Sequence, residues 1–259
     1  EARILLCNIL SCESSSLNEY HAHILSTAQL LRFKAMLKRR LLAVPIAYII
    51  GHQEFWKYDF IVSKATLIPR PDSETLIEAI LTDNPNKKSL RILELGVGSA
   101  CLIISLLLEN CSWQGVGVDI SLKALKIARI NASRYNLGQR MSLVQSNWFN
   151  SIRPQKFDLI ISNPPYIAIE ESNLMSLETL SFEPHCALFA QNNGLAAFKE
   201  IAKGAKSFLA NNGKVYVEVG FNQSEAVTSL FNNYGYQLVN KYRDLSNITR
   251  CLQFQLQNP

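Results

Sequence analysis

The sequence predicts an α/β fold in which a mostly parallel, doubly wound sheet follows a helical N-terminal segment. Two observations carry this prediction. From Leu90 onward, short apolar runs with strand character alternate with helical stretches, whereas residues 1 to 45 carry apolar side chains near helical spacing. Alternation of this kind places parallel strands in one sheet with helices on both faces. The 259 residues suffice for one such domain and a small companion domain.

The N-terminal helical segment is expected to end near Lys38-Arg39-Arg40. Positive charge is favourable at the C-terminus of a helix, and this explains the basic triplet better than a nucleic-acid-binding patch does. Pro45 and Gly51 then interrupt the chain. The segment is therefore predicted to form a separate helical unit.

Residues 53 to 68 contain a run rich in aromatic and β-branched residues, Phe55 to Val62. This composition predicts a β-hairpin or an extended linker, in which Phe55 packs either on a ligand or in the core of the linker. The sheet itself is predicted to contain the strands Arg91–Leu95, Gln114–Asp119, Met141–Gln145, Phe157–Ser162 and Lys214–Val219, with Tyr236–Lys241 and Arg250–Gln255 as an antiparallel end.

The composition is that of a well-packed globular protein, with 48% hydrophobic and 18% charged residues. The formal net charge of +5 is interpreted as ordinary surface charge. No apolar run reaches the roughly 18 residues that span a bilayer, so no membrane association is expected. The six cysteines and four histidines show no zinc-ligand spacing, which predicts reduced cysteines and no metal. A cytoplasmic location is expected, because no secretory signal is visible.

A glycine-rich segment follows the first predicted strand of the sheet, as Glu94-Leu95-Gly96-Val97-Gly98-Ser99-Ala100. Glycines permit a tight turn and let the backbone approach a ligand closely. The next strand ends at Asp119, 21 residues after Gly98, where a carboxylate can accept hydrogen bonds from ribose hydroxyls. Together these features predict an adenosine-containing cofactor. Cys101 occupies the position of the last glycine of a dinucleotide fingerprint, which disfavours a nicotinamide cofactor.

The fourth strand leads into Asn163-Pro164-Pro165-Tyr166, at the edge of the sheet where a doubly wound fold places its active site. The prolines fix the backbone and present the Pro164 carbonyl beside the Asn163 side chain. Tyr166 adds a flat face for stacking. Two acceptors at a rigid site fit a planar NH2 group. They would orient its nitrogen and stabilise the positive charge that develops on it during methyl transfer.

Several segments resemble the PrmC/HemK family of glutamine methyltransferases. Pro69-Arg70-Pro71-Asp72-Ser73-Glu74 resembles the PRPDTE segment of that family. The glycine-rich segment resembles motif I of class I methyltransferases, with Ala100 in place of the third glycine. The remaining similar segments are Pro45-x-x-Tyr48-x-x-Gly51-x-x-Glu54-Phe55, Asp119-Ile120-Ser121 with Ala124-Leu125, and Glu183-Pro184-x-x-Ala187-Leu188. The resemblance covers nearly the whole chain in order.

The resemblance implies a class I methyltransferase Rossmann-like domain with a seven-stranded sheet. It places a helical substrate-recognition domain at residues 1–50, a β-hairpin linker at 51–70 and the S-adenosylmethionine-dependent domain at 71–259. It also implies methylation of the side-chain amide nitrogen (N5) of the glutamine in the Gly-Gly-Gln motif of class I peptide chain release factors. S-adenosyl-L-methionine would be the donor and S-adenosyl-L-homocysteine the product.

The resemblance also assigns roles to individual residues. Trp148 would lie near the adenine, and Asn147 stands where many relatives have the aspartate that receives the adenine amino group. Arg70 and Glu183 would shape the substrate side. The residues predicted to bind the cofactor are Glu94, Gly96, Val97, Gly98, Ser99, Ala100, Asp119, Ile120, Asn147, Trp148 and Asn163. Those predicted to bind the glutamine amide and to be catalytic are Asn163, Pro164, Pro165 and Tyr166.

Three alternatives remain open from the sequence. The Asn-Pro-Pro-Tyr motif also occurs in methyltransferases of adenine amino groups in DNA or RNA. Such an enzyme would usually need a basic target-recognition domain, and most of the about 90 residues after Tyr166 are expected to complete the sheet. A ribosomal-protein glutamine methyltransferase would share the fold. A non-catalytic S-adenosylmethionine-binding protein is the third. The favoured interpretation is a monomer that acts on class I release factors and forms no stable complex with nucleic acid.

Overall fold

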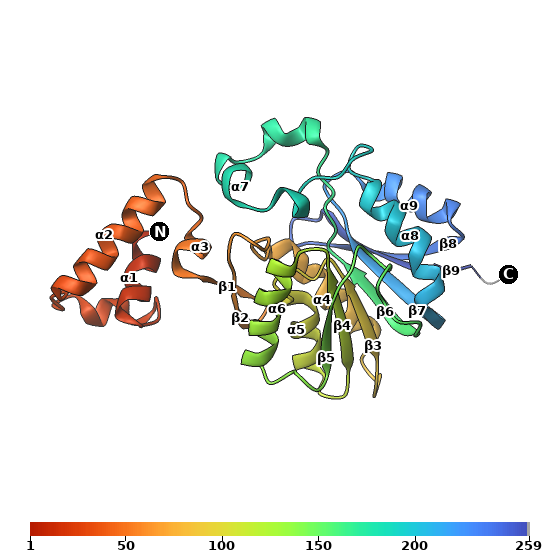
Figure 1. Cartoon of the computed structure of the whole chain (residues 1–259), viewed down its shortest axis with the longest axis horizontal. Helices are drawn as coiled ribbons and strands as arrows, with labels where there is room; N and C mark the ends of the chain where they lie inside the picture. Colours follow the sequence, from red (N-terminus) through yellow and green to blue (C-terminus); the bar gives the residue numbers. More distant parts are fainter. Residues whose placement is uncertain (258–259) are drawn as a thin grey trace.

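The computed structural model describes residues 1–257, and it begins with a helical unit that has its own small core. Leu5, Met36 and Tyr48 are buried together in this core. Figure 1 shows these helices to one side of the sheet. Helix α2 ends in Lys38, Arg39 and Arg40, as expected for a basic last turn. The elements are α1 (Ala2–Leu10), the 3-10 turn η1 (Ser16–Tyr20), α2 (Thr27–Leu41) and α3 (Ile46–Ile50).

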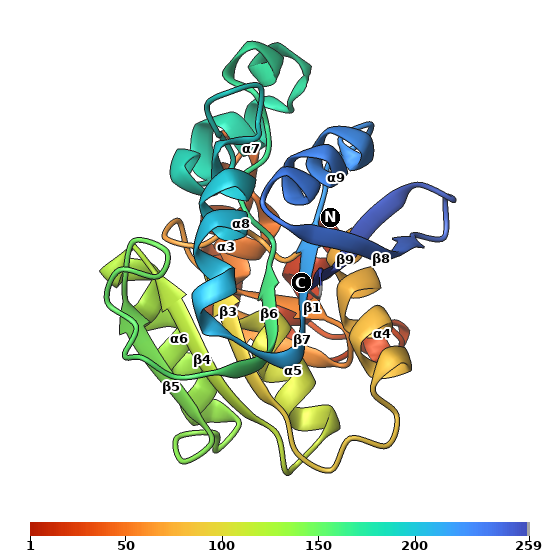
Figure 2. The ribbon, with the colours of Figure 1, turned by 90° about the vertical axis from the view of Figure 1, so that its right-hand side faces the viewer.

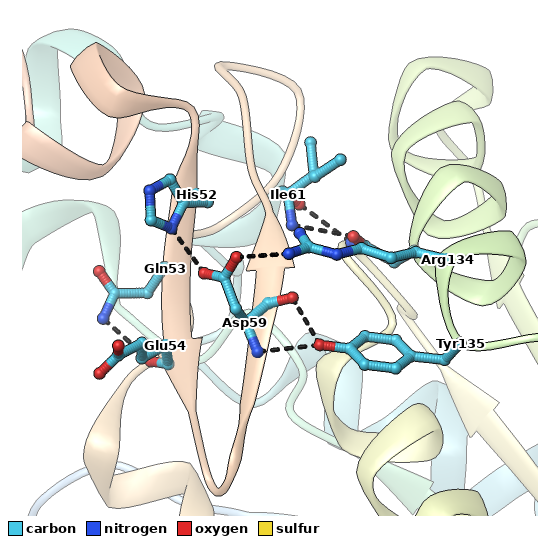
Figure 3. A network of polar contacts seen from close by, with 8 residues as sticks. His52, Gln53, Glu54, Asp59, Ile61, Arg134 and Tyr135 are labelled. Atoms are coloured by element: carbon cyan, nitrogen blue, oxygen red, sulfur yellow. Dashed lines mark hydrogen bonds and ion pairs between the residues drawn. The ribbon is translucent and has the colours of Figure 1, made fainter. Parts of the chain in front are cut away.

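A β-hairpin joins this unit to the rest of the chain, with strands β1 (His52–Phe55) and β2 (Tyr58–Ile61). Strand β2 faces helix α6 (Leu122–Arg134), from which Arg134 and the following Tyr135 reach Asp59 (Figure 3). Phe55 is 2% exposed and packs in the core, and is not part of any cavity wall described below. The hairpin prediction is therefore confirmed, with Phe55 as a core residue.

The central sheet has seven strands in the order β5-β4-β3-β6-β7-β9-β8. Neighbours from β5 to β7 run parallel, and β9 pairs antiparallel with both β7 and β8. Figure 2 shows β8 and β9 at the end of the sheet opposite β5. The predicted α/β fold is confirmed. The strands are β3 (Arg91–Leu95), β4 (Gln114–Asp119), β5 (Met141–Gln145), β6 (Phe157–Ser162), β7 (Leu209–Glu218), β8 (Tyr236–Arg243) and β9 (Thr249–Leu256).

Helices cover both faces of this sheet (Figure 1). On one face, α4 (Glu74–Asp83), α5 (Cys101–Glu109) and α6 bury apolar side chains in a cluster that includes Ile92 of β3. On the other face, α8 (Ala196–Phe208) and α9 (Ser224–Asn233) bury apolar side chains in a second cluster, which includes Leu93. Successive residues of a strand point to opposite faces, so a strand buried on both sides is a continuous apolar run. This explains why these strands were recognisable in the sequence.

Strand β7 begins earlier than its predicted start at Lys214. Leu209 already pairs with Phe157, and the register then shifts before Leu159 pairs with Lys214. Asn212 in between has a positive φ of 62°. An irregularity of this kind bends a strand and hides its start from a search for apolar alternation.

A long connection between β6 and α8 stands at the carboxyl ends of the strands. It contains η3 (Ile169–Leu174), α7 (Leu177–Phe182) and η4 (His185–Ala187), and a further turn, η2 (Pro71–Ser73), precedes α4. Arg40 of α2 reaches Glu178 of α7 at 2.9 Å and Glu1 at 2.7 Å, so it links the N-terminal helices to this connection.

Within residues 1–257, no helix is long and apolar enough to cross a membrane. All six cysteines lie in this range and are free. The same range holds no group of three histidine, cysteine or acidic residues arranged to hold a metal ion. The domain boundaries drawn at residues 50 and 70 stay a prediction, and residues 258 and 259 of the last predicted domain lie outside the described part.

Candidate functional site

A cavity of about 290 Å³ opens at the carboxyl ends of β3, β4, β5 and β6. This is the edge at which doubly wound sheets bind ligands. All residues predicted to hold the cofactor line this cavity except Ala100. Those in its wall are Glu94, Gly96, Val97, Gly98, Ser99, Asp119, Ile120, Asn147, Trp148 and Asn163.

The glycine-rich turn owes its shape to three residues with left-handed backbone conformations. Gly96, Gly98 and Ala100 have φ values of 73°, 53° and 67°. A Cβ atom added at Gly96 or Gly98 would meet nothing within 4 Å, so both positions leave room for a ligand. Ala100 is fully buried beneath the turn, where its N–H donates to Val97 O at 2.6 Å. The third motif position therefore sets the backbone conformation, and its side chain is not in the cavity wall.

Two carboxylates hold the turn and the helix that follows it in place. Asp119 accepts hydrogen bonds from the N–H groups of Gly98 at 2.9 Å and Ser121 at 2.8 Å. Glu94 is 2% exposed and accepts from the N–H of Ile103, in the first turn of α5, at 3.0 Å. Burial raises the pKa of Asp119 above its ordinary value and raises the pKa of Glu94 far more. A cation bound in this cavity would stabilise both ionised forms.

Two further residues line the cavity. Cys101 had no role predicted from the sequence, and Trp148 has an unusual backbone conformation. The thiol of Cys101 faces the cavity, and burial together with the nearby Glu94 raises its pKa. Trp148 is half-buried and has a positive φ of 50°. A bulky residue in this conformation is strained, and such strain concentrates at ligand-binding positions.

The Asn-Pro-Pro-Tyr segment directly follows β6. Asn163 and Pro165 line the cavity, whereas Pro164 is buried behind them. The side-chain Nδ2 of Asn163 donates a hydrogen bond to Ser73 Oγ at 3.0 Å. In this orientation of the amide, Oδ1 is available as an acceptor.

Tyr166 lies on the far side of this segment and contacts Glu218, the last residue of β7. Its hydroxyl donates to Glu218 Oε1 at 3.3 Å, and Gln223 Nε2 donates to its carbonyl at 2.8 Å. Glu218 is 2% exposed, and its Oε2 has no hydrogen-bond partner among the described residues. Burial raises the pKa of Glu218 to about 7, an effect that the hydroxyls of Ser73 and Tyr166 oppose.

A second cavity of about 260 Å³ lies on the other side of Asn163. It shares Leu67, Arg70, Asn163 and Ala187 with the first cavity. Its remaining wall comes from Tyr166, Ile167, Met175, Ser176, Thr179 and Leu188, most of them in the connection that contains α7. Two adjoining compartments thus have Asn163 in both of their walls.

Arg70 and Glu183 form an ion pair next to both compartments. Arg70 lines each cavity, whereas Glu183 is 4% exposed and lines neither. The second carboxylate oxygen of Glu183 accepts from the N–H of Ile68 at 3.0 Å. Glu183 therefore fastens the segment that carries Arg70 to the connection after β6.

Neither Ser73 nor Glu218 was assigned a role from the sequence. Ser73 lies inside the Pro-Arg-Pro-Asp-Ser-Glu segment, but its partner Asn163 is 90 residues away. The position of Glu218 at the site could have been predicted, because a carboxylate at the carboxyl end of a buried apolar strand lies at the ligand-binding edge of the sheet.

Comparisons with known proteins agree with this geometry. The methyltransferase small domain model matches residues 71–185, and the PrmC N-terminal domain model matches residues 1–51. The release factor glutamine methyltransferase of Shewanella oneidensis is 37% identical over 251 residues, which cover 97% of this chain and 87% of that protein.

Other relatives are longer or more distant. A bifunctional methyltransferase of Rickettsia conorii is 41% identical over 278 residues, which cover 98% of this chain and 53% of that protein. The chain thus spans about half the length of such relatives. The crystal structure of a ribosomal protein L11 methylase from Lactobacillus delbrueckii subsp. bulgaricus covers 80% of this chain and 90% of its own, with a TM-score of 0.56 and 17% identity. That likeness concerns the fold alone.

Proposed function

Because the chain belongs to the release factor glutamine methyltransferase family, we propose that it methylates the N5 amide nitrogen of the glutamine in the Gly-Gly-Gln motif of class I peptide chain release factors. The single observation that carries this proposal is the presence of Asn163 in the walls of two adjoining cavities. One compartment suits a donor and the other a planar acceptor, and Asn163 belongs to both.

The first compartment fits S-adenosyl-L-methionine. When bound, this group supplies an activated methyl and becomes S-adenosyl-L-homocysteine. Asp119 keeps acceptor capacity for a ribose besides its two N–H partners. The open space beside Gly96 and Gly98 admits the methionine part. Glu94 lies in the same cavity wall, and binding of the cationic donor would favour the ionised form of its carboxyl group against the effect of burial. Trp148 and Asn147 would contact the adenine.

The second compartment would hold the glutamine side chain. Asn163 Oδ1 would accept one amide hydrogen, while Tyr166 would stack on the amide plane. The Pro164 carbonyl stays the predicted second acceptor, although Pro164 is buried and lines neither compartment. Amide nitrogen is a poor nucleophile because its lone pair is delocalised. Acceptors fixed before the reaction stabilise the charge that develops on nitrogen, and they need no reorganisation. The proton leaves once the new carbon–nitrogen bond has formed, so no strong base is required beforehand.

The remaining roles follow from this assignment. The N-terminal helices and hairpin would recognise the body of the release factor, and Arg70 would guide its glutamine loop. The protein would act as a monomer in the cytoplasm, where its substrate takes part in translation, without stable binding to nucleic acid.

A methyl-transfer assay with S-adenosyl-L-methionine tests the proposal. It would compare a class I release factor, the same factor with its Gly-Gly-Gln glutamine changed to alanine, a ribosomal protein and duplex DNA, with the modified site identified by mass spectrometry. Methylation of that glutamine, lost in the alanine variant, is the expected result. Transfer to DNA or to the ribosomal protein alone would overturn it.

A further inference from the structure

Asn131 of α6 touches both the hairpin and the glycine-rich turn. Its Oδ1 accepts from the N–H of Ile61 at 2.8 Å, and its Nδ2 donates to the Ile61 carbonyl at 3.0 Å. The same Nδ2 donates to the Ser99 carbonyl at 2.9 Å. Asn131 is fully buried, and both of its N–H donors are used. One side chain thus joins the linker to the turn that lines the first cavity.

The Ser99 carbonyl lies at the centre of the strained part of the turn, between Gly98 and Ala100. Both neighbours have positive φ values, 53° and 67°. Such conformations persist where surrounding contacts fix them. Asp119 fixes the turn at the Gly98 N–H, from the side of β4, and Asn131 fixes it at the next carbonyl, from the side of α6. The two side chains hold consecutive residues of the turn and belong to different elements, β4 and α6.

We propose that Asn131 is a positioning residue for the cofactor, because it holds the glycine-rich turn in its binding shape and couples that shape to the β-hairpin. It touches neither ligand site, since it is absent from the walls of both cavities. The coupling is reciprocal, so cofactor binding should also steady strand β2.

The chain offers a matched control on the same helix face. Tyr135 follows Asn131 by four residues, and its hydroxyl bonds to both the N–H of Asp59 at 2.9 Å and its carbonyl at 2.7 Å (Figure 3). Tyr135 therefore clamps the same hairpin strand but makes no hydrogen bond to the turn. Tyr135→Phe loosens the hairpin alone, whereas Asn131→Ala loosens the hairpin and the turn.

The first measurement is hydrogen exchange of the protein without cofactor. Both variants should exchange faster over residues 58–61, but only Asn131→Ala should exchange faster over residues 96–100. The second is the Kd for S-adenosyl-L-methionine by calorimetry. Asn131→Ala should weaken binding about tenfold, the size of one lost hydrogen bond, and Tyr135→Phe no more than about twofold. Asn131→Leu replaces Asn131→Ala if the latter does not fold, because leucine fills a similar volume and removes both N–H donors.

Equal exchange of residues 96–100 in the two variants, or equal Kd values, would overturn the proposal and leave Asn131 as a hairpin residue only. The affinity measurement rests on the proposed function, whereas the exchange measurement does not. Absence of cofactor binding by the unmodified protein would overturn the proposed function, and the exchange comparison would still decide the role of Asn131.

Discussion

The turns after β3 and β6 lie side by side, since the two strands are neighbours, yet they reach rigidity by opposite means. The turn after β3 uses residues with left-handed backbone conformations and is held by Asp119. The turn after β6 is stiffened by Pro164 and Pro165, and its side chains are oriented by Ser73 and Glu218. The first turn offers backbone and empty space to a ligand, whereas the second offers oriented side chains. The difference predicts that changes in the first affect affinity and changes in the second affect turnover.

Removal of the acceptor amide should have the largest effect. Asn163→Ala should lower kcat by about 10²–10³-fold, because a hydrogen bond aimed at developing charge is lost. Calorimetry should give a donor Kd close to that of the unmodified protein, since Asn163 contributes only one part of the first cavity wall. A large loss of donor affinity with unchanged kcat would contradict the hypothesis that the turn after β6 affects turnover and not donor affinity.

Glu218→Gln should change how stability depends on pH. Burial raises the pKa of Glu218 from 4.5 to about 7 in the folded protein. The contribution of the protonated carboxyl group to stability is therefore fully present below pH 4.5 and is lost as the pH rises through 7. This shift corresponds to about 3 kcal/mol of unfolding free energy, at about 1.4 kcal/mol per pKa unit. Denaturant unfolding between pH 5 and 8 should show that loss in the unmodified protein but not in Glu218→Gln. Glu200→Gln, at an exposed position of α8, is the control and should leave the pH dependence unaltered.

Asp119→Ala is the counterpart of Asn163→Ala in the first turn. It removes the acceptor of the Gly98 N–H and the proposed ribose contact. The donor Kd should rise by about 10–100-fold, the range of hydrogen bonds to a charged group, while kcat at saturating donor changes less. Titration calorimetry and saturation kinetics measure the two quantities separately. A kcat effect larger than the affinity effect would contradict the assignment.

A smaller effect is expected for Ser73, because it acts through Asn163. Ser73→Ala should lower kcat about tenfold by freeing the Asn163 amide to rotate, with donor affinity retained. Ser73→Thr keeps the hydroxyl and should preserve most of the activity. Steady-state kinetics of both variants decide the point, and equal loss in the two would indicate a packing role instead.

The smallest effect is expected for Ala100, which has a left-handed backbone conformation at the end of the first turn. Ala100 has φ 67°, which costs a residue with a Cβ about 1 kcal/mol relative to glycine. Ala100→Gly should therefore raise the unfolding free energy by up to about 1 kcal/mol, as measured by thermal or denaturant unfolding. Ala128→Gly, inside α6, should do the opposite. A destabilised Ala100→Gly variant would show that the buried methyl group matters more than the backbone conformation.

The sequence predicted the parts of this site that depend on local pattern. Parallel strands are apolar runs, and the residues that follow them gather at one edge, so Gly96, Asp119 and Asn163 could be placed together before the structure was known. The fold class and the family are confirmed. Ala100 was predicted to contact the cofactor, but it does not line the cavity. A sequence motif does not distinguish a residue of the cavity wall from one that only sets the backbone conformation.

Contacts between distant segments could not be predicted in the same way. The Ser73–Asn163 bond spans 90 residues and the Asn131–Ile61 pair spans 70. Each depends on how a helix or turn packs on the sheet, which periodicity does not specify. The early start of β7 was missed for a related reason, because Asn212 interrupts the alternation on which strand prediction relies.

The thiol of Cys101 faces the compartment proposed for a potent alkylating agent. Thiolate is the reactive form of cysteine, and burial beside Glu94 raises the pKa of this thiol and so keeps it protonated. A small apolar side chain can therefore occupy the wall without becoming a competing methyl acceptor. Burial first, and the neighbouring Glu94 second, thus keep this position of the wall in the unreactive thiol form.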